Sequence, residues 1–232
     1  MIYVTGDTHG DFSRFSSNKF PEGRDLTKDD VIIIAGDFGL WHPTDEEKYW
    51  MGWLGKKSWT TVFVDGNHEN FDRLDALPEV DKWDGKVGVL NDWHSIYHLK
   101  RGYIYTINDK KIFTFGGGYS IDIMNRIPYR SWWPQELPNY QEYKRGLDNL
   151  ESIGYYVDYI ISHSCSNKDF NLMSQKHEMS YKNVDDENQL RNYFDLIHES
   201  VSFDKWFCGH FHVNNEVHGR THFLYRDIVR VV

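Results

Sequence analysis

Cysteine is scarce in this chain of 232 residues, which contains only Cys165 and Cys208. Two cysteines are too few for a disulfide framework, so the class of small disulfide-stapled secreted proteins is excluded, and we expect both to be packed thiols. The longest aliphatic run covers only residues 31–35, far short of the roughly 20 apolar residues that cross a bilayer. The chain also begins on an expected strand, without the basic region and cleavage site of a signal peptide. We therefore expect a cytoplasmic protein with no membrane partner.

Positive charge is also in short supply. There are 26 Lys and Arg residues against 35 Asp and Glu residues, which gives a formal net charge of −9. Such a surface repels long polyanions, so nucleic acid could be held only by a local basic patch or by bound metal. Hydrophobic and aromatic residues, at 40% and 16%, indicate a packed globule. Because no repeat or linker interrupts the sequence, we expect residues 1–232 to form a single domain.

Five short apolar strands are expected, and each of them ends in residues that can bind a metal. The expected strands are residues 2–5, 31–35, 60–64, 155–161 and 205–208. The donors that follow them, in the same order, are Asp7 and His9, Asp37, Asn67 and His68, His163, and His210 with His212. In α/β sheets, ligands bind outside the carboxyl ends of the strands, so these distant residues can converge on one place.

The donor types favour a particular class of metal. Aspartate and asparagine oxygens mixed with imidazole suit manganese, iron or zinc better than an ion that prefers thiolates. One carboxylate among seven donors can bridge two ions about 3.5–4 Å apart, the spacing that clamps a phosphoryl group. The sequence therefore predicts a dinuclear site.

The rest of the chain is expected to supply helices, a meander and loops. Helices are predicted at 45–57, 70–77, 142–152 and 185–200, with a shorter one near 13–20. Alternating residues predict an antiparallel meander of strands at 96–99, 103–107 and 111–115, with a hairpin turn at Asn108-Asp109. A loop insertion is expected around 116–140, a long polar connection at 166–183, and a closing hairpin with strands near 217 and at 222–231.

The motifs at the strand ends are Asp7-Thr8-His9, Gly36-Asp37, Gly66-Asn67-His68-Glu69, His163, and Gly209-His210-Phe211-His212. In this order, and over nearly the whole chain, they resemble the motifs of the calcineurin-like metallophosphoesterases. The resemblance implies an α/β fold, namely a four-layer αββα sandwich of two mixed β-sheets flanked by helices, with the dinuclear metal site at the C-terminal ends of the strands. It also implies a division of the ligands: one ion is held by Asp7, His9 and His212, the other by Asn67, His163 and His210, and Asp37 bridges them.

The activity implied by the resemblance is hydrolysis of phosphate esters by a hydroxide that bridges two divalent transition-metal ions. Manganese is the first choice, with iron or zinc as alternatives. His68 would be the general acid, and its alternative role is as a packing neighbour of Asn67. The expected substrate is a phosphorylated small molecule, a nucleotide or a short nucleic acid, as a monoester or a diester. The alternatives are a nuclease or nucleotide phosphodiesterase of the same fold, or a non-catalytic metal-binding regulatory protein.

Residues on the substrate side are less sharply defined. Arg126 and Arg130 follow three glycines, and each could fork onto phosphate oxygens or remain solvated. Asn67 is expected to contact substrate as well as metal, whereas Glu69 is expected only to cap the following helix. Protein phosphatases of this superfamily continue with Asp-Arg-Gly after the second motif, but here Asp37 is followed by Phe-Gly-Leu. The aspartate that would orient His68 is therefore missing.

Overall fold

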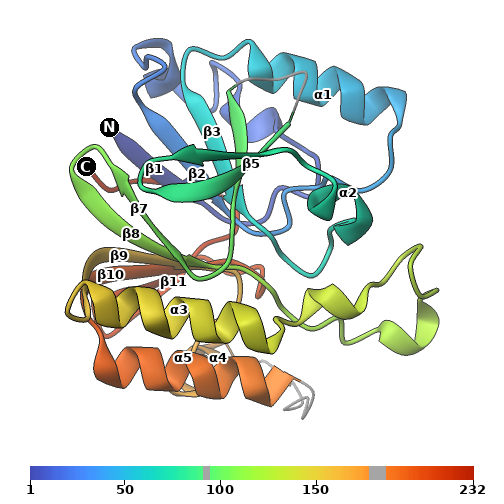
Figure 1. Cartoon of the computed structure of the whole chain (residues 1–232). Coiled ribbons are helices and arrows are strands. Elements are labelled where there is room, and N and C mark those ends of the chain that lie inside the picture. Colours follow the sequence, from blue (N-terminus) through green and yellow to red (C-terminus); the bar gives the residue numbers. More distant parts are fainter. Residues whose placement is uncertain (91–94, 178–186) are drawn as a thin grey trace.

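Two β-sheets stack face to face in the computed structural model, and helices cover both outer faces (Figure 1). The structure describes residues 1–90, 95–177 and 187–232. The first sheet, in the order β13-β1-β2-β3-β6-β5-β4, contains β1 (Ile2–Thr5), β2 (Val31–Ala35), β3 (Thr60–Val64), β4 (Glu79–Lys82), β5 (Gly85–Val89), β6 (Ile96–Leu99) and β13 (Ile228–Arg230). The second, in the order β11-β12-β10-β9-β8-β7, contains β7 (Tyr103–Ile107), β8 (Lys110–Phe115), β9 (Tyr156–Ser162), β10 (Ser202–Cys208), β11 (Asn215–Val217) and β12 (Thr221–Phe223).

The helices lie on the two outer faces and in the connections (Figure 1). The α-helices are α1 (Asp45–Gly55), α2 (Phe71–Asp75), α3 (Tyr140–Ser152), α4 (Asn167–Lys176) and α5 (Asn188–Ser200). Short 3₁₀ turns are η1 (Ser13–Phe15), η2 (Pro21–Arg24), η3 (Ile123–Asn125) and η4 (Pro134–Glu136). Side-chain caps fix several helix starts: the Thr44 hydroxyl accepts from the Glu47 amide before α1, and Asn139 forms a capping box with Glu142 before α3. In the described part of the chain, no helix is long and apolar enough to cross a membrane.

Alternation along the buried strands produces the four layers. In β1, Ile2 and Val4 face the core between the sheets, whereas Tyr3 faces the opposite core under α1. The second sheet likewise turns Ile161 toward the inter-sheet core and Ile160 toward α3 and α5. Successive strand side chains point to opposite faces, so each central strand contributes to two apolar layers. The expected four-layer αββα sandwich of two mixed sheets is confirmed.

Parallel pairing brings the important strand ends to one edge. β1, β2 and β3 are neighbouring parallel strands, as are β8, β9 and β10 in the other sheet. Their carboxyl ends therefore meet where the chain turns into the donor-bearing loops.

The expected meander at 96–115 is wrong. β6 belongs to the first sheet, where it pairs parallel to β3 and antiparallel to β5, whereas β7 and β8 form a hairpin in the second sheet. The chain crosses between sheets around Gly102, whose φ is +77° and where a Cβ would lie 2.8 Å from the Gly146 amide nitrogen. The hairpin turn itself is confirmed, because Asn108 and Asp109 both have positive φ, 48° and 60°.

Four other expectations need correction. The connection expected at 166–183 contains α4, which begins after the Ser166 cap and buries Phe170 and Met173; residues 178–183 lie outside the described part. The helix expected at 185–200 is α5 from Asn188 onward, and residues 185–186 are likewise outside it. The expected closing strand at 222–231 is broken: β11 and β12 form a hairpin in the second sheet, whereas β13 pairs with β1 in the first. The helix expected near 13–20 is only the 3₁₀ turn η1, and β4 and β5 were not predicted.

Candidate metal centre

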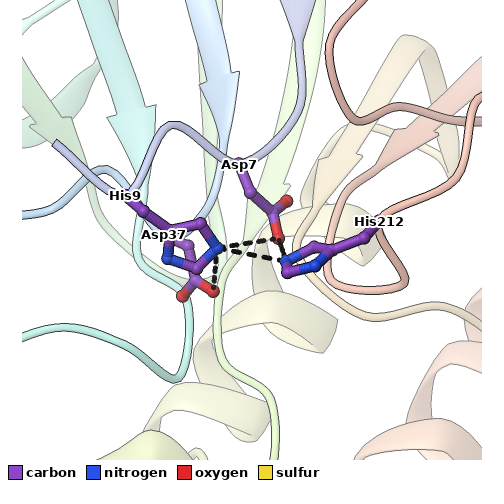
Figure 2. Close-up of side chains that lie close together, drawn as sticks. All are labelled: Asp7, His9, Asp37 and His212. Carbon is purple, nitrogen blue, oxygen red and sulfur yellow. Dashed lines mark hydrogen bonds and ion pairs between the residues drawn. The ribbon is translucent and has the colours of Figure 1, made fainter. Parts of the chain in front are cut away.

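Four donors gather where β1, β2 and β10 end (Figure 2). One ligand atom from each of Asp7, His9, Asp37 and His212 lies within 4.8 Å of the others. His212 Nε2 is 3.1 Å from both Asp7 Oδ2 and His9 Nε2, and His9 Nε2 is 3.7 Å from Asp37 Oδ2. These spacings leave the four atoms facing a common point.

A second group lies on the other side of Asp37. His163 Nε2 is 3.0 Å from Asn67 Oδ1 and 3.5 Å from Asp37 Oδ1, and the His163 and His210 rings are 4.9 Å apart between centroids. Asp37 therefore turns Oδ2 toward the first group and Oδ1 toward the second. This is the arrangement that a bridging carboxylate needs.

Hydrogen bonds outside the two groups orient these donors. His163 Nδ1 lies 2.9 Å from the Ala35 carbonyl oxygen, so Nδ1 carries a proton, and in the neutral ring Nε2 then offers its lone pair. The Asn67 amide nitrogen donates to Ser120 Oγ at 3.1 Å, which turns its oxygen toward His163. Both contacts prepare an electron pair for a cation.

The charge balance also fits a metal. The carboxylates of Asp7 and Asp37 are fully buried, and within the described residues their ion-pair partners are histidines rather than lysine or arginine. Buried carboxylates without a permanently charged partner are costly unless a cation neutralises them. The donor set, with its mixed oxygen and imidazole ligands, therefore suits divalent transition-metal ions.

Glycines and residues with a strained backbone let the loops pass close to the candidate ligand carboxylates. A Cβ on Gly66 would lie 2.0 Å from Asp37 Oδ1, and one on Gly209 would lie 2.2 Å from Asp7 Oδ1. Four of the candidate ligands have a left-handed backbone that side chains rarely adopt, with φ of 47°, 47°, 69° and 53° at His9, Asp37, His210 and His212. The ligand loops are thus tight turns.

The pKa values of two candidate ligands, Asp7 and His210, favour their metal-binding forms at neutral pH. Those of His163 and His212 are raised: burial would lower the pKa of His163 but Asp37 and Asp7 raise it, and the hydrogen bond with Asp7 raises that of His212. Burial alone would raise the pKa of Asp7, but its hydrogen bond with His212 and the nearby His163 lower that pKa to about 2. Burial lowers the pKa of His210 to about 4. Asp7 is therefore a carboxylate and His210 a neutral imidazole, the forms that act as ligands.

His68 lies beside the two groups in a cavity of about 490 Å³, together with Arg126. Arg126 Nη2 is 3.1 Å from His68 Nδ1 and 3.3 Å from Nε2, while its Nε donates to Asp122 Oδ1 at 2.7 Å. Burial lowers the pKa of His68, and the charge of Arg126 lowers it further. Arg130 is exposed and does not line this cavity, so of the two arginines only Arg126 is placed at the centre.

Sequence reasoning assigned Glu69 wrongly. The helix α2 is capped by Asn70, whose Oδ1 accepts from the Arg73 amide, whereas the Glu69 side chain is buried and points elsewhere. It accepts hydrogen bonds from the amides of Phe38, Gly39 and Leu40 at 2.6, 3.3 and 3.1 Å. Glu69 thus holds the loop that follows Asp37, a role that no local sequence signal indicates.

Another supporting network went unnoticed in the sequence. Asp65, at the end of β3, is buried between Arg101 Nε at 2.8 Å and His98 Nε2 at 3.0 Å, and its carbonyl accepts from the Gly117 amide at 2.9 Å. Burial would raise the pKa of Asp65, but Arg101 and His98 hold it well below its usual range. The network ties the β3 end to the glycines after β8. Its members are far apart in sequence, so only the fold brings them together.

The model of the calcineurin-like phosphoesterase family matches residues 1–214 of the chain. The chain therefore belongs to this family, whose members are typically metal-dependent phosphoesterases. No curated protein matches the chain.

Proposed function

We propose that this protein is a dinuclear metal-dependent hydrolase of phosphate esters. The observation that carries the proposal is Asp37, which has one carboxylate oxygen toward each of two donor groups. One ion would be held by Asp7, His9 and His212, the other by Asn67, His163 and His210. Manganese is the proposed metal, with iron or zinc as alternatives.

The two ions, when bound, would supply an activated water nucleophile and neutralise the phosphoryl oxygens. The chain's own residues do the rest. His68 would protonate the departing oxygen, since its imidazole lies beside Asp37 and Asn67 in the same cavity. Arg126, held by Asp122, would donate to a phosphate oxygen or steady the His68 ring. The second amide hydrogen of Asn67 is free of the Ser120 contact and would also reach substrate.

Two rival functions remain distinguishable by experiment. A nuclease or nucleotide phosphodiesterase would share the centre but need a nucleotide substrate. A regulatory protein would bind the ions without turnover, and the presence of His68 beside a complete donor set argues against it.

We further propose that residues 1–232 act as one cytoplasmic domain.

Metal analysis with a substrate panel tests the proposal. After reconstitution with manganese and desalting, we expect two ions per chain by elemental analysis, and hydrolysis of aryl phosphate esters that stops on chelation and returns with manganese. Two ions without any turnover would favour the regulatory protein. One ion or none would overturn the dinuclear assignment.

A further inference from the structure

Three cavities have candidate ligands in their walls, and the proposed chemistry uses only one of them. The first, of about 490 Å³, contains His68 and Arg126, and we call it the leaving-group cavity. The largest, of about 860 Å³, is lined by Asp7, Thr8 and His9 among others, and we call it the second cavity. Its volume is in the range of pockets that hold small molecules.

The walls of the second cavity are fixed by internal contacts. One wall is the 13–22 segment and the other is the 225–230 segment. Arg14 joins them: its guanidinium donates to Thr5 Oγ1 at 2.9 Å, to the Gly6 carbonyl at 3.2 Å, and to the Tyr225 carbonyl. The Tyr225 ring stacks on the ligand His212, with centroids 4.6 Å apart and planes at 17°. The cavity is therefore continuous with the ligand shell and held in shape by it.

The lining of the second cavity is polar and carries both signs of charge. Lys19, Arg226 and Arg230 line it, and none of them is ion-paired with an Asp or Glu side chain in the described part of the chain. Asp11, Glu22 and Asp227 line it as well, beside the aromatic rings of Tyr3, Phe20 and Tyr225. Charges of both signs and aromatic rings together suit a polar occupant that has hydrogen-bonding groups and a flat face.

A cavity beyond the leaving-group cavity bears on how many organic substituents the phosphate ester carries. In an in-line displacement the departing oxygen lies opposite the nucleophile, while the other phosphoryl oxygens point sideways. A monoester has one organic substituent, which would fill the leaving-group cavity and leave the second cavity without a role. A diester carries another substituent on a sideways oxygen, and that arm has to leave the centre in a different direction.

We propose that the substrate is a phosphodiester whose polar, non-leaving substituent occupies the second cavity. The proposal rests on the function proposed above and narrows it. Hydrolysis adds water across the P–O bond to the leaving group, so the leaving alcohol departs with a proton and the product in the second cavity is a monoester. A nucleoside and a glyceryl group are both polar substituents with hydrogen-bonding hydroxyls. Comparing the hydrolysis of the two diesters distinguishes them.

Four substrates with the same leaving group test the idea on the manganese-loaded protein. They are 4-nitrophenyl phosphate, its methyl diester, its glyceryl diester, and thymidine 5′-(4-nitrophenyl phosphate). The leaving group is constant, so differences in kcat/KM report the non-leaving arm. We expect the better of the thymidine and glyceryl diesters to exceed the methyl diester by at least about tenfold, because an arm that fills the cavity adds binding in the transition state. The diester with the higher kcat/KM shows whether the non-leaving substituent is a nucleoside or a glyceryl group.

A cavity-filling variant locates the effect. Asp227 is exposed, lines the second cavity and has no side-chain ion pair among the described residues, so Asp227→Trp should narrow the cavity without removing a structural contact. We expect it to lower kcat/KM for the preferred diester at least about tenfold more than for the methyl diester. Asp29→Trp is the matched control, because Asp29 is exposed and lies outside both cavities. It should leave the ratio of the two diesters unchanged.

Product inhibition gives an independent readout. The product that keeps the preferred arm, thymidine 5′-phosphate or glycerol phosphate, should inhibit more strongly than inorganic phosphate, and Asp227→Trp should abolish the difference. A monoester rate above that of every diester, or an equal effect of Asp227→Trp on all diesters, would overturn the diester proposal while phosphoesterase function stands. Turnover of none of the esters, with two ions bound, would overturn both.

Discussion

Asp37 is the residue on which both candidate ion sites depend, since its two oxygens face different donor groups. Asp37→Asn removes the shared negative charge and replaces one ligand oxygen with an amide nitrogen. We expect this variant to lose more bound manganese and more activity than any other single ligand change, whereas replacing Asp7 or His163 should chiefly affect one ion. Elemental analysis and initial rates test this, with Asp29→Asn as the exposed control. A variant with near-normal metal and rate would refute the bridging role.

The rate loss caused by removing His68 should grow with the pKa of the leaving alcohol. We expect His68→Ala to keep both ions and to slow hydrolysis of alkyl esters by about 10²–10⁴-fold, because their alkoxides need a proton as they depart. Esters of acidic phenols should lose much less rate, since the phenolate leaves unaided. Rates on both ester types, with metal content measured in parallel, make the test. Equal losses with both ions still bound would instead indicate a role in binding the phosphate.

The sequence predicts the donors better than their supports. Asp7, Asp37 and His163 stand directly after apolar strands, so strand prediction and chemistry together place them near one edge. Glu69 could not be understood in this way, because its hydrogen-bond partners are amides about 30 residues away in the loop after Asp37. Local pattern carries no information on such contacts.

At the scale of elements, buried strands were predicted closely and sheet membership was not. The predicted bounds of β1, β2 and β3 match the structure to the residue, because each is a continuous apolar run flanked by polar turns. β6 and β13 were misplaced because alternation has the same period in either sheet. The pairing of a strand depends on where the intervening chain crosses, as it does near Gly102.

The segment between β8 and α3 carries Arg126 and is anchored by Glu136. Glu136 Oε2 accepts from the Ser120 amide at 3.2 Å, whereas the buried Oε1 has no hydrogen-bond partner among the described residues. Burial raises the pKa of Glu136 to about 8. In the unfolded chain this group ionises near its ordinary pKa of 4.5, so between pH 4.5 and 8 the folded state retains a proton that the unfolded state releases. The free energy of unfolding should therefore fall as pH rises through this window.

Glu136→Gln tests this contribution, because the amide cannot ionise. We expect the variant to gain stability relative to the wild type by on the order of a few kcal/mol between pH 5 and pH 8. Urea unfolding at both pH values, at one fixed manganese concentration, measures the difference. Parallel pH dependence in the two proteins would mean that Glu136 is ionised in the folded state.

At the scale of the whole molecule, the centre joins the two sheets. Asp7, Asp37 and Asn67 follow strands of the first sheet, whereas His163 and His210 follow strands of the second. Ions bound between them would hold the sheets together and should raise the melting temperature. At manganese 100-fold above the dissociation constant, each site adds about 2.7 kcal/mol, or roughly 5–10 °C for a domain of this size.

Calorimetry across a manganese titration measures this effect, and a chelator should reverse it. Asp37→Asn should flatten the titration, whereas Asp29→Asn should follow the wild type. A melting temperature that does not respond to manganese in the wild-type protein would count against ligation from both sheets.

Four candidate ligands, His9, Asp37, His210 and His212, have a left-handed backbone. The same residues that would bind the ions therefore lower the stability of the fold. Glycine adopts such angles freely, and strain of this kind at other residues costs on the order of 1–3 kcal/mol each. A mutant library selected for heat resistance alone, without metal, would therefore enrich glycine at these four positions and delete most of the ligand set. Selection for stability without selection for activity would therefore remove candidate ligands. Any effort to stabilise this protein would have to keep these four residues unchanged.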